Sequence, residues 1–192
     1  MRVALLFICF FCTGMTLAAT EPTYNHLQVQ LVMLDKAKDV VALAANPIII
    51  DAVKAHNKLE IPLALIKQRD SQWLASPANS AFKLSLQRNR IGVLLKSTVL
   101  RNRAIYSEAF VTDNQGANVG AYPVTTDYWQ GDEEKFAIAF NGGRGQLLIT
   151  PVSFDKSTFT FAAQVAAPVV NDKGETIGVL FVGIKLSYAQ IR

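Results

Sequence analysis

A chain of 192 residues, 51% of them hydrophobic, is long enough to bury one sizeable core, so a single domain is expected. The net charge of +4 becomes +3 without Arg2, because 18 basic and 15 acidic residues then remain, and this excess is too small to predict nucleic-acid binding. Both cysteines, Cys9 and Cys12, fall within the first twenty residues. The rest of the chain therefore has no disulfide, no catalytic thiol and no thiolate zinc site.

The N-terminal stretch MRVALLFICFFCTGMTLAAT has the pattern of a secretory signal peptide. Arg2 precedes an apolar run, and small residues end it at Ala18 and Ala19. We predict a cleaved signal peptide over residues 1–19, one domain over residues 20–192, and a periplasmic or secreted product. The alternative is an uncleaved anchor, for which the apolar stretch is at the lower limit of a membrane span.

The first half of the mature chain has helical periodicity. Residues 24–45 predict one long amphipathic helix, and Asn46-Pro47 predicts the start of a second, because Asn favours the cap and Pro the first helical position. Residues 61–75 and 79–101 predict further helices, separated at Ser76-Pro77. The apolar positions expected along the first helix are Leu27, Leu31, Leu34, Val41 and Ala45.

After Arg103 the pattern changes to strands. Residues 104–122 carry β-favouring residues on both sides of a turn, DNQG, and the closing stretches TFTFAAQVAAPVV and ETIGVLFVGIKL flank a second turn, NDKG. A short strand is expected over residues 146–151. Helices followed by strands predict an α+β domain with an antiparallel sheet.

The order of these features resembles the Cache (PDC) family of extracellular, PAS-like sensor domains, of the single-Cache type. The features are the long N-terminal helix, the Asn-Pro break, the TDNQG turn, the loop TTDYWQGDEEKF and the closing VAAPVVNDKGETIGVLFVGI. The resemblance covers essentially all of the mature chain. It implies a sheet of about five strands with the long helix packed on it, and a small-molecule pocket on the other face under the loop of Tyr128 and Trp129.

The resemblance also implies ligand-binding residues. In the amino-acid-binding branch of this family a Tyr precedes an Arg, a Trp follows two positions after that Arg, and an Asp lies downstream. In this chain Tyr122, Trp129 and Asp155 match the Tyr, the Trp and the Asp, but Asp127 stands in the place of the Arg. A carboxylate there favours a cationic amine over an amino acid's carboxylate. The predicted ligand-binding residues are therefore Tyr122, Asp127, Tyr128, Trp129 and Asp155.

Other interpretations apply to the same residues. Asp127 is also typical of the cap of a helix beginning near Tyr128, with Trp129 in the core. The acidic run of residues 132–134 predicts a solvated helix face, His26 and His56 stand alone, and the glycine-rich residues 142–145 lack the frame of a phosphate loop. Gly178 and Gly183 are read as making room over the sheet. No catalytic residue, metal site or cofactor is predicted, and the protein is not expected to be an enzyme.

Two functions remain from the sequence. The first is a stand-alone sensor domain that binds a small molecule and signals through a membrane-bound partner, expected because no transmitter segment follows in the given sequence. The second is a secreted interaction or scaffold protein whose pocket is filled by its own side chains. The N-terminal helix is expected to mediate any homodimer, because the apolar positions of that helix extend further than one small sheet covers.

Overall fold

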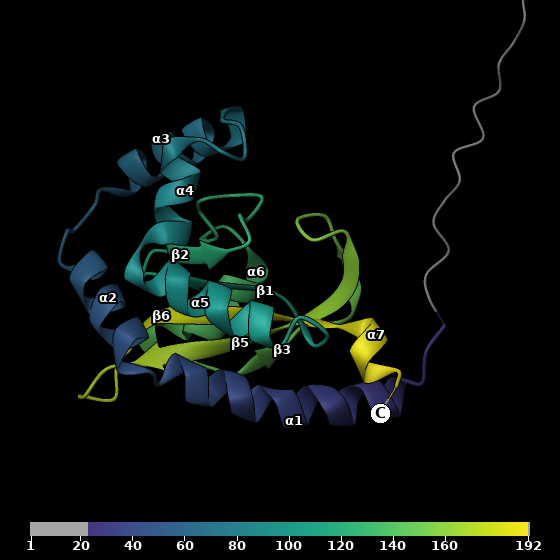
Figure 1. Ribbon diagram of the computed structural model, residues 1–192. Helices are drawn as coiled ribbons and strands as arrows, with labels where there is room; N and C mark the ends of the chain where they lie inside the picture. Colours follow the sequence, from purple (N-terminus) through teal and green to yellow (C-terminus); the bar gives the residue numbers. More distant parts are fainter. Residues whose placement is uncertain (1–22, 192) are drawn as a thin grey trace, which may run out of the picture.

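The structure is a computed structural model that describes residues 23–191. The predicted signal peptide and its cleavage site lie outside the described residues. The described chain folds as an α+β domain in which five helices precede all the strands of the sheet (Figure 1). None of the helices within residues 23–191 is both long and apolar enough to cross a bilayer.

The predicted helices are present. They are α1 His26–Ala44, α2 Pro47–Asn57, α3 Leu63–Ala75, α4 Ala81–Arg88 and α5 Arg90–Arg101. Asn46 caps α2 as expected, since its Oδ1 accepts a hydrogen bond from Ile48 N at 2.9 Å and Pro47 is the first helical residue. The single helix expected over residues 79–101 is divided at Asn89, which caps α5 by accepting from Gly92 N at 2.7 Å.

The sheet is antiparallel and has six strands rather than about five, in the order β2-β1-β6-β5-β3, with β4 also paired to β5. Both hairpins form at the predicted turns, and the short β4 is the strand that the sequence did not indicate. The strands are β1 Tyr106–Thr112, β2 Asn118–Tyr122, β3 Leu148–Ile149, β4 Ser153–Asp155, β5 Thr160–Val170 and β6 Thr176–Lys185.

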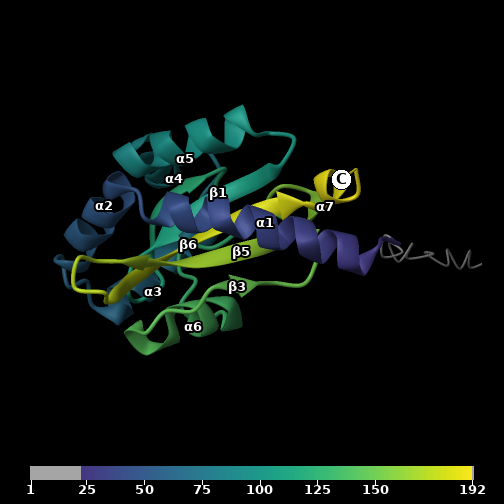
Figure 2. The ribbon, with the colours of Figure 1, turned by 90° about the horizontal axis from the view of Figure 1, so that it is seen from below.

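Helices cover both faces of this sheet. α1 packs on β5 and β6, and α5 packs on β1 and β2, together enclosing the main core; Figure 2, seen from below, shows α1 crossing β5 and β6. The opposite face carries a smaller core that contains Phe110 and Phe181 and is covered by α6 Glu134–Phe140. α7 Leu186–Ala189 contacts α1, so both ends of the described chain lie together (Figure 1).

The long helix packs on the sheet with a different face from the leucines that the sequence emphasises. Its buried residues are Val29, Met33, Ala37, Val40 and Ala44, whereas the exposed fractions of Leu27, Leu31, Leu34 and Val41 are 66%, 59%, 55% and 45%. α1 therefore has one face buried against the domain and a second apolar stripe on its surface.

A third core lies away from the sheet, between α3, α4 and the loop that precedes α6. It contains Trp73, Tyr128 and Leu86, with Phe82 and Trp129 packed at its margin. No helix begins near Tyr128: α6 starts at Glu134, and Trp129 instead forms an isolated bridge with Ala117. The interpretation of Asp127 as the cap of a helix at Tyr128 is therefore wrong.

Candidate functional site

The aromatic pair predicted to roof a pocket packs into the third core. Tyr128 is 2% exposed, and its ring centroid lies 5.9 Å from that of Trp73 and 5.1 Å from that of Phe82. Burial raises the pKa of the Tyr128 hydroxyl. Trp129 donates from Nε1 to the Gln115 carbonyl oxygen at 2.8 Å. Tyr128 thus packs the loop against α3 and α4, and Trp129 joins it to the β1–β2 turn by a hydrogen bond.

Asp127 contributes mainly its backbone. Its carbonyl oxygen accepts hydrogen bonds from Asn118 Nδ2 at 3.0 Å and Thr125 Oγ1 at 2.7 Å, while its carboxylate accepts from Thr126 Oγ1 at 3.0 Å. The carboxylate that positions the aromatic pair is Asp70 on α3, whose Oδ1 accepts from the backbone N–H groups of Tyr128 and Trp129 at 2.8 and 3.0 Å. Sequence reasoning missed Asp70 because the contact joins segments far apart in the chain.

Tyr122 packs against the main core and not in the third core. It ends β2, and Lys96 Nζ on α5 lies 5.6 Å from the centroid of its ring. The structure therefore does not bring Tyr122, Asp127, Tyr128 and Trp129 together around one cavity.

Asp155 does face a cavity. The space has a volume of about 420 Å³ and opens on the sheet face that carries α6. Thr126, next to Asp127, also lines it, so the loop of Tyr128 and Trp129 borders this cavity through a neighbouring residue. The polar and charged residues of its wall are Glu108, Thr126, Glu133, Lys135, Thr150, Ser153, Asp155, Lys156 and Gln164.

Glu108 is the most deeply buried ionisable group of this wall. It is 3% exposed; its Oε1 accepts from Gln164 Nε2 at 2.6 Å, and its Oε2 lies 3.0 Å from Ser157 Oγ. Burial, and then the negative charge of Asp155, raise the pKa of Glu108. Gly183 makes room here as the sequence indicates, because a Cβ at that position would lie 2.2 Å from Ser107 Oγ and 3.1 Å from Glu108 Cγ.

Two lysines line the cavity, and of these Lys135 has a carboxylate partner whereas Lys156 is exposed. Lys135 on α6 pairs with Glu133 Oε2 at 3.1 Å, and its Nζ lies 5.6 and 5.7 Å from the ring centroids of Phe110 and Phe181. Within residues 23–191 no three His, Cys, Asp or Glu side chains gather so as to hold a metal ion. The arrangement can accept hydrogen bonds from a positively charged group at Glu108 and Asp155.

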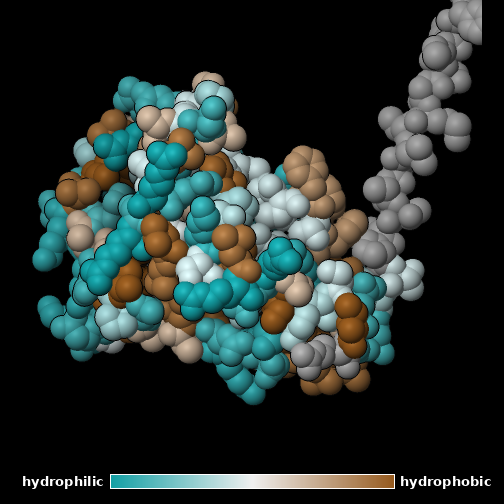
Figure 3. All heavy atoms as spheres, in the orientation of Figure 1, coloured by the Kyte–Doolittle hydropathy of each residue, from teal (hydrophilic) through white to brown (hydrophobic). Residues whose placement is uncertain are grey.

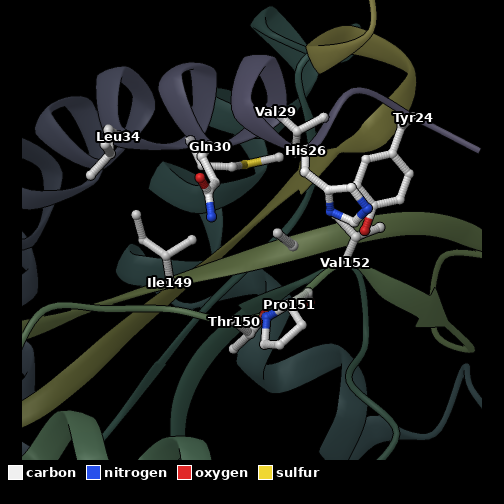
Figure 4. Close-up of a pocket in the computed structure, with 11 residues that line it drawn as sticks. Tyr24, His26, Val29, Gln30, Leu34, Ile149, Thr150, Pro151 and Val152 are labelled. Carbon is white, nitrogen blue, oxygen red and sulfur yellow. Dashed lines mark hydrogen bonds between the residues drawn. The ribbon is translucent and has the colours of Figure 1, made fainter.

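A second, larger cavity of about 540 Å³ lies on the other side of the sheet edge (Figure 4). Tyr24 faces it from just before α1, His26 and Gln30 face it from the first turns of α1, and Ile149 and Pro151 face it from the β3–β4 segment. Its remaining lining is mostly apolar, and no Asp, Glu, Lys or Arg is among the residues that line it. The cavity at Glu108 is the stronger candidate site because it contains a buried carboxyl group, the kind of group that is typical of functional sites.

Solved structures resemble the fold. No protein-family model and no curated protein sequence matches the chain. The E. coli DcuS sensor domain matches with a TM-score of 0.51 and 19% sequence identity, over 85% of this chain and 97% of that chain. The sensor domain of the V. cholerae histidine kinase DctB matches with a TM-score of 0.50 and 13% identity, over 85% of this chain. This chain spans about half of the DctB structure, 53% of its length. The protein thus has the fold of Cache (PDC) sensor domains, as the sequence resemblance predicts.

Proposed function

We propose that this protein is a non-catalytic sensor domain, located in the periplasm or secreted, that binds a small cationic amine and signals through a membrane-bound partner. The observation that carries the proposal is Glu108, a buried carboxyl group in a cavity that Asp155 also lines. Two carboxyl groups at one end of a cavity favour a cation there, because a charged donor makes the strongest hydrogen bonds to carboxylates. The fold shared with sensor domains supports the sensing role.

The two lysines of the wall also favour an amine over a carboxylate ligand, because Lys135 is already paired and the side chain of Lys156 is exposed to solvent. Because Glu133 neutralises the ammonium group of Lys135 and two aromatic rings lie beside it, Lys135 is not a free counter-charge for an anion. A volume of about 420 Å³ is within the range of small-molecule sites, which favours ligand binding over the alternative of a self-filled scaffold domain.

A thermal-shift screen of amines, amino acids and carboxylates tests this function. A ligand present at about 100 times its dissociation constant adds roughly 2.7 kcal/mol to the free energy of unfolding. For a domain of this size the melting temperature is expected to rise by about 5 to 10 °C with small primary or quaternary amines. Shifts with carboxylates alone would contradict the amine, and no shift with any of the three classes would favour the scaffold function.

We also propose that two copies pair through α1. The exposed residues Leu27, Leu31, Leu34 and Val41 follow one another at intervals of four, three and seven, which is the spacing of a coiled-coil seam. Lys38 stands between the last two in the same register, where its aliphatic stem can pack while its ammonium group reaches water. Apolar and hydrophilic side chains alternate along the lower edge of the molecule in Figure 3, where α1 lies.

Leu31→Glu is expected to weaken this dimer at least 100-fold. A symmetric dimer loses two leucine contacts, each worth about 1.5 to 3 kcal/mol when buried, and gains two charges at the seam. Leu74→Glu is the matched control, since Leu74 is 61% exposed but lies on α3. Sedimentation velocity over a concentration series measures the effect. A wild type that stays monomeric at millimolar concentration, or equal effects of both variants, would contradict the α1 interface.

A further inference from the structure

The hydroxyl group of Ser157 lies between two carboxyl groups. Its Oγ is 3.0 Å from Glu108 Oε2 and 2.8 Å from Asp155 Oδ1, and both distances are those of hydrogen bonds. A serine hydroxyl carries a single hydrogen atom, so it cannot donate fully to both carboxylates. One of the two contacts therefore needs a proton from another group.

The surroundings assign the serine hydrogen to Asp155. The backbone N–H of Ser157 donates to Asp155 Oδ1 at 2.8 Å, and Thr158 Oγ1 donates to Asp155 Oδ2. Such a set of donors stabilises an ionised carboxylate. Glu108 Oε2, by contrast, has Ser157 Oγ as its hydrogen-bond partner. If Ser157 donates to Asp155, the contact with Glu108 is satisfied when Glu108 carries a proton and donates it to Ser157 Oγ.

The charges around Glu108 agree with this assignment. Asp155 on β4 acts on Glu108 as a negative charge, and Lys135 on α6 acts as a positive one. Glu133 pairs with Lys135 and so reduces its influence, and Lys156, next to Asp155, is exposed. Burial is the largest effect, and together with Asp155 it outweighs the hydrogen bond from Gln164 and the charge of Lys135, so that the pKa of Glu108 is raised.

We propose that Glu108 in the free protein is a neutral acid that donates its proton to Ser157, and that a cationic amine displaces this proton into water as it binds. The inference rests on the proposed function of this cavity as an amine site. In the exchange, the carboxylic acid loses a proton to solvent and the resulting carboxylate pairs with the ammonium group; no bond of the amine changes. Ligand affinity is thereby coupled to pH.

The coupling has a definite sign. While Glu108 is protonated, the affinity for the amine rises about tenfold for each unit of pH, and it becomes constant once Glu108 is ionised in the free protein. The stability of the free protein changes in the opposite sense. A group whose pKa is higher in the folded than in the unfolded protein contributes its full stability at pH values below its unfolded pKa. This contribution is lost as the pH rises through its folded pKa.

The first arm of the test needs no ligand. The unfolding free energies of wild type and Glu108→Gln, whose amide imitates the neutral acid, are measured by urea denaturation from about pH 4 to about pH 8. Wild type is expected to lose stability relative to Glu108→Gln as pH rises, and then to stay constant. Carbon-13 NMR of the glutamate carboxyl groups, with the variant assigning the Glu108 signal, measures the same proton directly. Parallel stability curves and a Glu108 signal that titrates with the other glutamates would overturn the proposal.

The second arm measures proton release. Titration calorimetry with n-butylammonium chloride, in buffers of different ionisation enthalpy, gives the number of protons released per amine bound. About one is expected at acidic pH and none above the pKa of Glu108. Binding of the amine without proton release would overturn the inference but leave the amine site standing. If the first arm shows that Glu108 is protonated but no amine binds in the thermal-shift screen, the proposed function is overturned, and the displacement of the proton with it.

Discussion

Trp73→Ala is expected to lower the free energy of unfolding by about 3 to 5 kcal/mol, the range for removing a large buried aromatic side chain. Trp73 is fully buried between α3, α4 and the loop before α6, with its ring centroid 5.3 Å from that of Phe82. Its Nε1 also donates to the Thr125 carbonyl oxygen at 3.0 Å, so the substitution leaves that buried acceptor without its partner. Urea denaturation followed by circular dichroism measures the loss.

The matched control is Leu74→Ala, one residue further along the same helix. Leu74 is 61% exposed, so its truncation should change the unfolding free energy by no more than about 0.5 kcal/mol. Because Thr125 precedes the cavity residue Thr126, Trp73→Ala should also weaken ligand binding, whereas Leu74→Ala should not. A loss below about 1 kcal/mol for Trp73→Ala would mean that the third core does not stabilise the domain.

Local signals explain the part of the fold that the sequence predicts. Asn46-Pro47 starts a helix because the cap and the fixed proline backbone act within a few residues, and the DNQG and NDKG turns close hairpins for similarly local reasons. The three-residue β4 carries too few residues to show a strand pattern. Asn89, a capping residue, marks the division of α4 from α5, but one such residue is a weak signal within a long helical pattern.

The face of α1 that packs on the sheet could not be chosen from side-chain size. The leucines form the more conspicuous pattern, yet the sheet contacts Val29, Ala37 and Ala44. Two apolar stripes coexist on this helix, and a helical period alone does not say which of them is internal. The choice depends on how closely the helix approaches β5 and β6.

The residues of the candidate site were likewise predictable only in part, because several of their contacts join segments that are far apart in the sequence. Asp155 was placed by family resemblance, and it lines the cavity. Tyr128 and Trp129 were expected at a pocket because large rings often line one, but Trp73, more than fifty residues upstream, completes a core around Tyr128. Glu108 was missed although a signal was present: an acidic residue inside a strand that is buried along its whole length needs a partner or a function.

Glu108→Gln is expected to weaken the binding of a cationic amine by about 10- to 100-fold, or roughly 1.5 to 3 kcal/mol, the scale of a hydrogen bond to a charged group. The glutamine keeps the shape of the side chain but cannot become an anion. Stability near neutral pH should not fall, because the amide avoids burying a charge. A variant that fails to fold would show in the thermal melt, and Asp155→Asn then tests the second carboxylate of the same cavity.

Asp127→Asn is the matched control for this substitution. Both variants remove one carboxylate while conserving shape, but of these two residues Glu108 lines the cavity and Asp127 does not. The backbone carbonyl of Asp127, which holds Asn118 and Thr125, is unchanged by the substitution. Amine affinity is therefore expected to stay within about twofold of wild type, whatever the pH.

Titration calorimetry of n-butylammonium chloride against wild type, Glu108→Gln and Asp127→Asn, at one pH near neutrality, tests the amine site most directly. The account predicts binding by wild type and Asp127→Asn with similar affinity, and a loss of about 10- to 100-fold in Glu108→Gln. Undiminished binding by Glu108→Gln, or a loss confined to Asp127→Asn, would contradict the assignment of the site to the cavity at Glu108.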